Sequence, residues 1–325
     1  MRIFYLICSL FSFAGLTAGA QEFDFVVDQN GAGDFDKVQD AIDAVPYLRK
    51  TRTIIFIKNG VYKEKLTLPA NKTNVSFIGE DVENTILNYD DYASRKNRFG
   101  EEMGTSSSAS FFIFGDGFEA RNITFQNTAG PVGQAVAVRI DGDRTIFENC
   151  RFLGFQDTLY PHGDQSRQYY RNCYIEGTTD FIFGWSTAVF EDCEIFSING
   201  GHYITAASTL EDAEYGFVFV NCRITGNAPE QSVYLGRPWR PFAKTVFISC
   251  ELGAHINNAG WHNWDKPNAE KTAYYAEYQS EGPGASDLTS RVNWSHQLDE
   301  NDLKKYALKK IFEGWIPYGQ SSLNF

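Results

Sequence analysis

The chain has 325 residues and carries a formal net charge of −12, from 29 basic and 41 acidic side chains. An acidic chain of this size argues against nucleic acid and against an anionic membrane surface as partners. If the ligand is itself a polyanion, the face that binds it has to be locally neutral or basic. Aromatic residues make up 15% of the sequence, which suits both a stacked interior and a groove that binds sugars.

The first twenty residues have the composition of an export signal. Arg2 supplies a positive start, residues 3–16 are largely apolar, and Ala18-Gly19-Ala20 forms a small-residue cleavage site. The apolar run is short for a transmembrane helix, and no later segment is long and apolar enough for one. The sequence therefore predicts a signal peptide over 1–20, cleaved near Ala20. The protein is expected to be exported, periplasmic or secreted, without a membrane anchor.

Residues 21–325 are predicted to form a single large domain, because no Pro-, Gly- or Ser-rich linker interrupts them. The protein is expected to be a monomer. Near its start, residues 33–45 carry apolar side chains at helical spacing, with Asp34 or Asp36 as the expected N-cap and Pro46 following. We expect this helix to cover an open end of the fold.

A short motif recurs through the middle of the chain. It consists of an aromatic residue, any residue, a small polar residue, Cys, any residue and an aliphatic or aromatic residue. It is found at 147–152, 170–175, 190–195, 219–224 and 247–252, with weaker copies at 74–77 and 122–125. The polar positions are 23, 20, 29 and 28 residues apart. Short β-prone cores with variable gaps are typical of a solenoid. The predicted fold is therefore all-β, a single-stranded parallel β-helix.

Five cysteines lie beyond the predicted signal peptide, each at the same place in the repeat: 150, 173, 193, 222 and 250. Their equivalence favours a column of small buried side chains over disulfides. Cys-x-x-Cys pairs are absent from the sequence, so we expect no metal site there. A second amphipathic segment follows Asp299, its expected N-cap, with Leu303, Tyr306, Ala307 and Ile311 at helical spacing. We expect it to cover the other end of the solenoid.

Two aspartates and two glutamines stand out among apolar neighbours. Asp157 and Asp180 are 23 residues apart, and Gln134 precedes Asp157 by 23. In a coiled chain these residues would stack on one face with Gln156, and Arg237 would follow two coils later. Two close carboxylates have separated pKa values, so an arginine beside Asp180 would keep it charged while Asp157 holds a proton. The glutamines offer amide donors for an oxyanion. The chain has no Gly-x-Ser-x-Gly motif, which disfavours a Ser-His-Asp esterase.

Five segments then carry a family resemblance: 60–64 (Gly-x-Tyr-x-Glu), 134–139 (Gln-Ala-Val-Ala-x-Arg), 154–159 (Gly-x-Gln-Asp-Thr-Leu), 180–184 (Asp-Phe-Ile-Phe-Gly) and 235–239 (Leu-Gly-Arg-Pro-Trp). In this order they resemble the marker segments of the pectin methylesterases, family 8 of the carbohydrate esterases. The resemblance implies a right-handed parallel β-helix that needs no metal or cofactor and removes methyl groups from methyl-esterified pectin. No inhibitor-like helical region precedes the motifs, so a bacterial-type enzyme is expected.

The resemblance also implies a role for each matching residue. Asp180 is the expected nucleophile, Asp157 the proton donor and later the base, and Arg237 the group that orients Asp180. Gln134 and Gln156 are expected to stabilise the oxyanion. Sugar contacts are expected from Thr105 and Trp239, with Tyr160 and Phe183 as groove walls and with Gln134 and Arg237 also touching substrate.

Two other interpretations stay open. A polysaccharide lyase on the same fold would need a calcium-binding acid cluster, and a glycosidase would place its two carboxylates across a glycosidic bond. The second interpretation is a non-catalytic carbohydrate-binding β-helix. The serine-rich run from Ser106 to Ser110 suggests no function.

Overall fold

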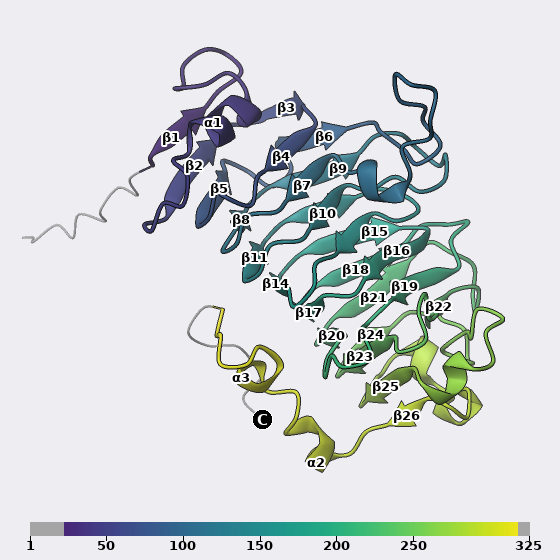
Figure 1. Ribbon diagram of the computed structural model, residues 1–325. Helices are drawn as coiled ribbons and strands as arrows, with labels where there is room; N and C mark the ends of the chain where they lie inside the picture. Colours follow the sequence, from purple (N-terminus) through teal and green to yellow (C-terminus); the bar gives the residue numbers. More distant parts are fainter. Residues whose placement is uncertain (1–22, 318–325) are drawn as a thin grey trace, which may run out of the picture.

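The computed structural model describes residues 23–317, so the predicted signal peptide lies outside the described residues. The backbone winds in coils that stack along one axis, and a central coil gives one strand to each of three parallel sheets (Figure 1). This arrangement is a parallel β-helix, as predicted. Within the described residues, no helix is both long enough and apolar enough to cross a membrane.

The strands of each sheet follow one another along that axis. The 11-stranded sheet contains β1 (Phe25–Val27), β2 (Thr53–Ile57), β5 (Val75–Gly79), β8 (Glu119–Arg121), β11 (Thr145–Glu148), β14 (Arg167–Arg171), β17 (Thr187–Glu191), β20 (Phe217–Val220), β23 (Lys244–Ile248), β25 (Tyr274–Tyr278) and β26 (His296–Gln297). The 8-stranded sheet contains β3 (Gly60–Lys63), β6 (Thr85–Tyr89), β9 (Thr124–Asn127), β12 (Arg151–Leu153), β15 (Tyr174–Gly177), β18 (Glu194–Ser197), β21 (Arg223–Gly226) and β24 (Glu251–Leu252). The 7-stranded sheet contains β4 (Leu66–Leu68), β7 (Phe111–Ile113), β10 (Val138–Ile140), β13 (Leu159–Pro161), β16 (Thr179–Gly184), β19 (Tyr203–Ala207) and β22 (Tyr234–Gly236). Short 3-10 turns are η1 (Thr105–Ser107), η2 (Ala269–Lys271), η3 (Pro283–Ala285) and η4 (Leu288–Ser290).

The repeated motif makes the corner between the 11-stranded and 8-stranded sheets. Its small polar residue has a left-handed backbone in every strong copy, with φ between 51° and 54° at Asn149, Asn172, Asp192, Asn221 and Ser249. Short polar side chains tolerate this conformation best among residues other than glycine. The corner chemistry therefore explains why the polar position recurs.

The interior is filled by columns of identical repeat positions. The aromatic residue of the motif stacks on its counterpart one coil away, with ring centroids 5.1 Å apart for Phe147–Tyr170 and 4.5 Å apart for Phe190–Phe219. The five cysteines of the repeat are buried and free, which agrees with the predicted column of small buried side chains. Repeated burial of this kind makes each coil depend on its neighbours.

Helix α1 (Val38–Ala44) covers the first coils, as expected, and buries its apolar face in the core. The predicted cap was wrong. Lys37 is the N-cap residue and makes no capping bond, whereas the carboxylate of Glu64 accepts hydrogen bonds from the backbone N–H groups of Val38 and Gln39 at 2.9 and 3.1 Å. Asp34 accepts instead from the backbone of Val26. Glu64 thus has a structural role in its motif.

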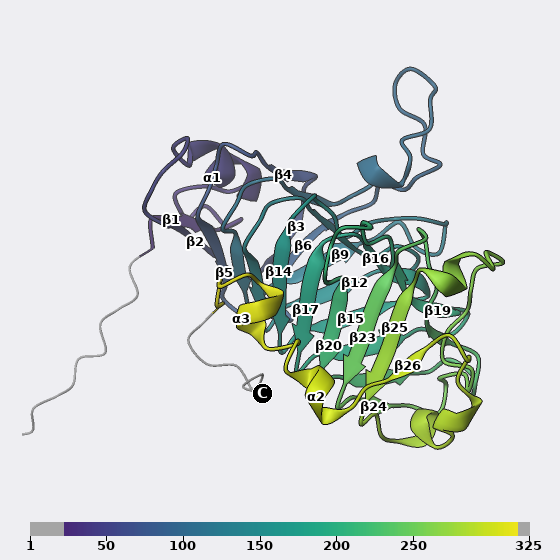
Figure 2. The same cartoon turned by 60° about the horizontal axis from the view of Figure 1, so that its bottom comes forward.

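The C-terminal segment differs from expectation in place. Asp299 does cap α2 (Glu300–Leu303), through a capping box. However, α2 and α3 (Leu308–Ile311) lie along the outer face of the 11-stranded sheet, not over the last coil (Figures 1 and 2). The outward side chains of this sheet are apolar, including Ile146, Val189, Val218 and Val246, so they require a cover. The C-terminal segment therefore covers this apolar face.

Candidate active site

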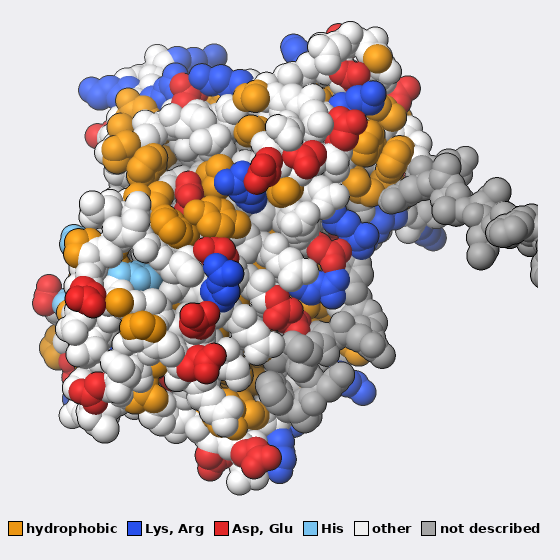
Figure 3. Space-filling view, turned by 180° about the vertical axis from the view of Figure 1, so that it is seen from behind, with side chains coloured by type: hydrophobic (Ala, Val, Ile, Leu, Met, Phe, Trp, Pro, Cys, Tyr) orange, Lys and Arg blue, Asp and Glu red, His pale blue; other side chains and the backbone are white. Residues whose placement is uncertain are grey.

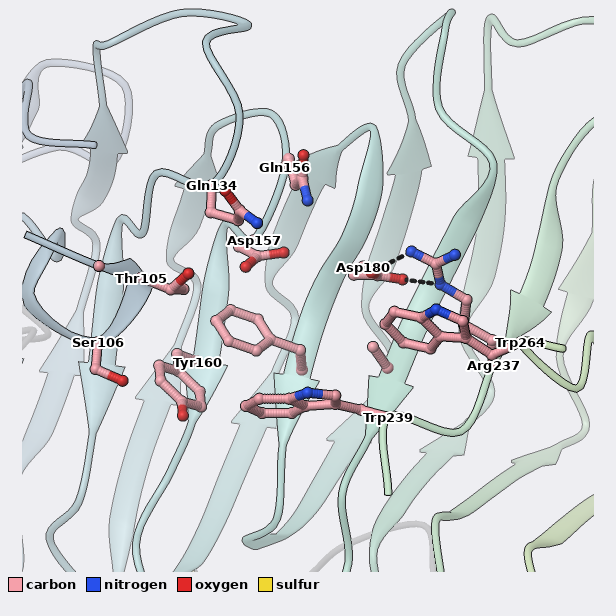
Figure 4. A pocket seen from close by; sticks show the side chains of 13 residues that line it. Thr105, Ser106, Gln134, Gln156, Asp157, Tyr160, Asp180, Arg237, Trp239 and Trp264 are labelled. Carbon is pink, nitrogen blue, oxygen red and sulfur yellow. Dashed lines mark hydrogen bonds and ion pairs between the residues drawn. The ribbon is translucent and has the colours of Figure 1, made fainter. Parts of the chain in front are cut away.

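A groove of about 470 Å³ lies on the 7-stranded sheet. It is lined by Gly104, Thr105, Ser106, Gln134, Gln156, Asp157, Tyr160, Asp180, Phe183, Ala206, Arg237, Trp239 and Trp264 (Figure 4). All nine residues that the sequence nominated are among them. The sequence reasoning missed Gly104, Ser106, Ala206 and Trp264. Ser106 belongs to the run that suggested no function, and Trp264 to the aromatic-rich segment 260–264.

Strand register brings the two aspartates together. Leu159 pairs with Ile182, which preserves the predicted step of 23 residues, and the backbone N–H of Asp157 donates to the carbonyl of Thr179 at 3.2 Å. The expected register of Gln134 was wrong by one position. Gln134 pairs with Gln156 and not with Asp157. The spacing between these paired residues is one residue shorter than the 23-residue spacing between Leu159 and Ile182 in the next coil. The two amides consequently lie side by side next to Asp157 (Figure 4).

Both aspartates have unusual backbones. Asp157 has φ of 65° and Asp180 has φ of 51°, the left-handed region that residues with a Cβ rarely occupy. Asp180 also lies where the register of β16 against β19 shifts, between Thr179 and Ile182. Such irregularities re-aim a side chain, and they cluster at functional sites. Here they turn the carboxylates into the groove while Ile182 stays in the core.

Arg237 holds Asp180 through a two-pronged ion pair. Its Nε donates to Oδ1 at 2.9 Å and its Nη2 to Oδ2 at 2.6 Å (Figure 4). The guanidinium is itself sandwiched between two rings, 3.9 Å from the centroid of Tyr203 and 3.6 Å from that of Trp264. Stacking on both faces leaves the guanidinium only in-plane freedom, so the carboxylate of Asp180 is fixed in orientation. The two-coil interval predicted between these residues is correct, since β16, β19 and β22 are successive strands.

Burial and charge give the two carboxyl groups different pKa values. Burial, reinforced by the negative charge of Asp180, raises the pKa of Asp157 well above its ordinary value. Burial also raises the pKa of Asp180, but the hydrogen bonds and charge of Arg237 oppose that shift. When the two acids hold a single proton between them, that proton therefore resides on Asp157, in line with the sequence reasoning. The sequence placed both acids among apolar neighbours, but it led us to expect a lowered pKa for Asp180, whereas burial leaves that pKa raised.

The floor of the groove is aromatic. Tyr160 and Phe183 stack with centroids 4.0 Å apart, and Trp239 lies 5.9 Å from Phe183. Behind this floor Arg139 pairs with Asp141 and donates to the carbonyl of Ser106 at 3.0 Å, which holds η1 and its Thr105 at the groove wall.

Metal ligands do not cluster in the groove. Across residues 23–317, no group of three or more His, Cys, Asp or Glu side chains is arranged to hold a metal ion.

Comparison with known proteins gives a consistent result. The family model described as Pectinesterase matches residues 24–314. Pectinesterase 31 of Arabidopsis thaliana is 43% identical over 282 residues, covering 85% of this chain and 88% of that protein. Probable pectinesterase/pectinesterase inhibitor 64 of the same plant is 40% identical, covering 92% of this chain but 52% of that longer protein.

Solved structures agree in fold. Pectin methylesterase from carrot superimposes with a TM-score of 0.83 at 35% identity, covering 93% of this chain and 99% of that one. Pectin methylesterase PemA from Erwinia chrysanthemi gives 0.80 at 28% identity, covering 92% and 99%. The curated relatives named here are plant proteins, so the expectation of a bacterial-type member has no support from them. The chain belongs to the pectinesterase family and is a carboxylic ester hydrolase.

Proposed function

We propose that this protein hydrolyses the methyl esters of homogalacturonan, releasing methanol and leaving a galacturonate carboxylate. The observation that carries the proposal is the convergence of a proton-holding Asp157, an arginine-held Asp180 and two amides in one groove. The names of the relatives and a structure of a pectin methylesterase in complex with a hexasaccharide, with a TM-score of 0.80, support the substrate class.

In the first half-reaction, a carboxylate oxygen of Asp180 attacks the carbonyl carbon of the ester. The carbonyl electrons move to oxygen, and the amides of Gln134 and Gln156 donate to the resulting oxyanion. When this intermediate collapses, the bond to the methoxy group breaks and Asp157 gives its proton to the departing methanol. Asp180 is then joined to the sugar through an anhydride, and Asp157 is ionised.

The second half-reaction restores both acids. Asp157, now a base, takes a proton from a water molecule that attacks the acyl carbon, and the amides again stabilise the oxyanion. Collapse releases the Asp180 carboxylate and the product carboxylic acid, which then loses its proton to solvent and becomes galacturonate. The raised pKa of Asp157 suits it to both duties, since it has to hold a proton and later accept one at the same site.

The aromatic floor fits the sugar chain. Tyr160, Phe183 and Trp239 offer apolar ring faces to galacturonate units, and Thr105 offers a hydroxyl at the wall. Arg237 has both prongs on Asp180, so its contact with substrate is secondary to holding the nucleophile.

Methanol release from esterified homogalacturonan tests the activity, with chain length followed in parallel. We expect methanol without shortening of the polymer. Unsaturated products would indicate a lyase, shorter chains a glycosidase, and saturable binding without any product a carbohydrate-binding protein. Asp180→Asn, which keeps the size of the side chain but loses the nucleophile, is expected to abolish methanol release. An active Asp180→Asn protein would overturn the assigned role.

We also propose that the protein is exported as a monomer after cleavage near Ala20, with residues 21–325 forming the catalytic domain. The composition of residues 1–20 supports export. N-terminal sequencing of secreted material and a sizing measurement test both points.

A further inference from the structure

We infer that Arg240 and Lys266 form a carboxylate-binding subsite at the Trp239–Trp264 end of the groove. It would bind a free galacturonate carboxylate that neighbours the ester being cleaved. The inference rests on the proposed function, because it assigns the charge of a neighbouring sugar unit in the same substrate.

Local charge at this end is opposite to that of the whole chain. The chain is acidic, and acidic and basic side chains are interspersed on the face drawn in Figure 3. Exposed arginines elsewhere are commonly paired, for example Arg223 with Glu194 at 3.0 Å. Within residues 23–317, however, neither Arg240 nor Lys266 takes part in an ion pair. Two neighbouring cations without an ion pair make this end of the groove locally positive, which suits an anion that comes from outside.

Both cations are positioned against groove residues. The guanidinium of exposed Arg240 lies 5.4 Å from the ring centroid of Trp239, and prolines on either side of this Trp-Arg pair restrict its backbone. The Lys266 ammonium lies 4.3 Å from the centroid of Trp264 and donates to the carbonyls of Pro238 and Trp239, both at 3.1 Å. An ammonium has three N–H donors, so one remains for a ligand.

The cations here crowd one another. Burial lowers the pKa of Lys266, and the neighbouring guanidinium groups of Arg240 and Arg237 lower it further, against the opposing charge of Asp180. Asp180 is already engaged by Arg237 through both carboxylate oxygens. An additional carboxylate would therefore relieve repulsion among three cations that share one anion.

Among the described residues, the side chains that line the opposite end of the groove carry no charge. This end is lined by Gly104, Thr105, Ser106 and Gln134. Two cations that hydrogen-bond to η1 at this end are paired, Lys65 with Asp91 at 2.5 Å and Arg139 with Asp141 at 2.8 Å. The two ends of the groove therefore differ in charge. A chain with esterified and free units would place its free unit at the Trp239–Trp264 end, where an indole face and a cation are both available.

Arg240→Gln tests the subsite with two substrates, nearly fully esterified and half de-esterified homogalacturonan. We expect kcat/KM for methanol release to fall about 3- to 5-fold on the half de-esterified polymer at low salt, the upper part of the range of one exposed ion pair. On the fully esterified polymer the loss is expected to stay within about 2-fold. Arg240→Lys is expected to recover much of the loss, because it keeps the charge.

Salt and a matched control separate this effect from general damage. At about 0.5 M salt the Debye length falls to about 4 Å, and the difference between wild type and Arg240→Gln should disappear. Arg223→Gln removes an exposed arginine on the outer face of β21 and should match wild type on both polymers. An equal loss on both polymers, or no loss on the de-esterified one, refutes the subsite.

A direct binding measurement tests the subsite independently of the proposed activity. If the wild type releases no methanol from either polymer, the proposed function fails, and calorimetric titration with a fully de-esterified oligogalacturonate still tests the subsite. Arg240→Gln is expected to raise the Kd of that oligomer about 3- to 5-fold. An unchanged Kd contradicts the inference whatever the activity.

Discussion

Replacing Arg237 by lysine probes the link between the ion pair and the ionisation of the nucleophile. The side chains of Asp180 and Arg237 are 8% and 16% exposed, so little water is available to replace a lost bond. Lysine retains the positive charge but cannot reproduce two parallel hydrogen bonds at 2.9 and 2.6 Å. A hydrogen bond to a charged group contributes about 1.5–3 kcal/mol, so kcat/KM near neutral pH should fall by about 10- to 150-fold.

The same loss predicts a change in pH dependence. Arg237 lowers the pKa of Asp180 against the effect of burial, so weakening the pair raises this pKa further. At about 1.4 kcal/mol per pH unit, the acid limb of the kcat/KM profile should move upward by about 1–2 units. The sign follows from the chemistry, because only the ionised form of Asp180 attacks the ester.

A methanol-release assay across the pH range measures both effects in one experiment. Part of the activity of Arg237→Lys should return as the pH is raised, until deprotonation of Asp157 limits the rate. A loss that is the same at every pH would show that the lysine disturbs geometry alone. An acid limb at the wild-type position would refute the argument from the ion pair.

Four further outcomes are expected. Asp157→Asn should reduce kcat to a trace. Because the pKa of Asp157 is raised in the folded state, the same change should stabilise the fold at about pH 7 but not at about pH 3, where the acid is protonated in both the folded and unfolded states. Thermal unfolding at the two pH values checks this, and an equal change in Tm at both would contradict it. Gln156→Ala should lower kcat about 10²- to 10³-fold with little change in KM, so a defect confined to KM would argue against an oxyanion donor. Tyr203→Leu should move the acid limb of the kcat/KM profile in the same direction as Arg237→Lys, whereas Tyr203→Phe, which keeps the ring, should leave the limb at its wild-type position. A pH profile unchanged by both substitutions would show that the Tyr203 ring does not hold Arg237 in place. Phe312→Ala should lower the free energy of unfolding by about 3–5 kcal/mol with kcat unchanged, as measured by denaturant titration and assay; a large change in kcat would mean that the C-terminal segment reaches the groove.

The coil and its interior were predictable because their determinants are local and repeated. A polar residue that accepts a left-handed corner, an aromatic residue two positions earlier and a small thiol next to the corner recur in each strong copy. Each copy pairs with the next in parallel register, so counting residues predicts which side chains stack. The pairing of Leu159 with Ile182 follows this rule and brings Asp157 and Asp180 together.

The same counting failed where the register is irregular or the contact is distant. Gln134 was misplaced by one position because the coil that contains it is shorter. Trp264 and Tyr203 were not foreseen as the two faces of the Arg237 clamp, since they come from segments without a common period. Glu64 caps α1 across 26 residues, a distance at which capping patterns in the sequence give no signal.

The sequence by itself determined the winding of the chain and the pair of acids on one face, because backbone corners and strand register are set by neighbouring residues. Only the tertiary structure decided how those acids behave. Burial raises both pKa values, and Arg237 opposes the shift through its charge at both acids but through hydrogen bonds only at Asp180. Within residues 23–317, Arg240 and Lys266 at one end of the groove take part in no ion pair. These properties depend on the distance to water and to other charges, which only the assembled coils define.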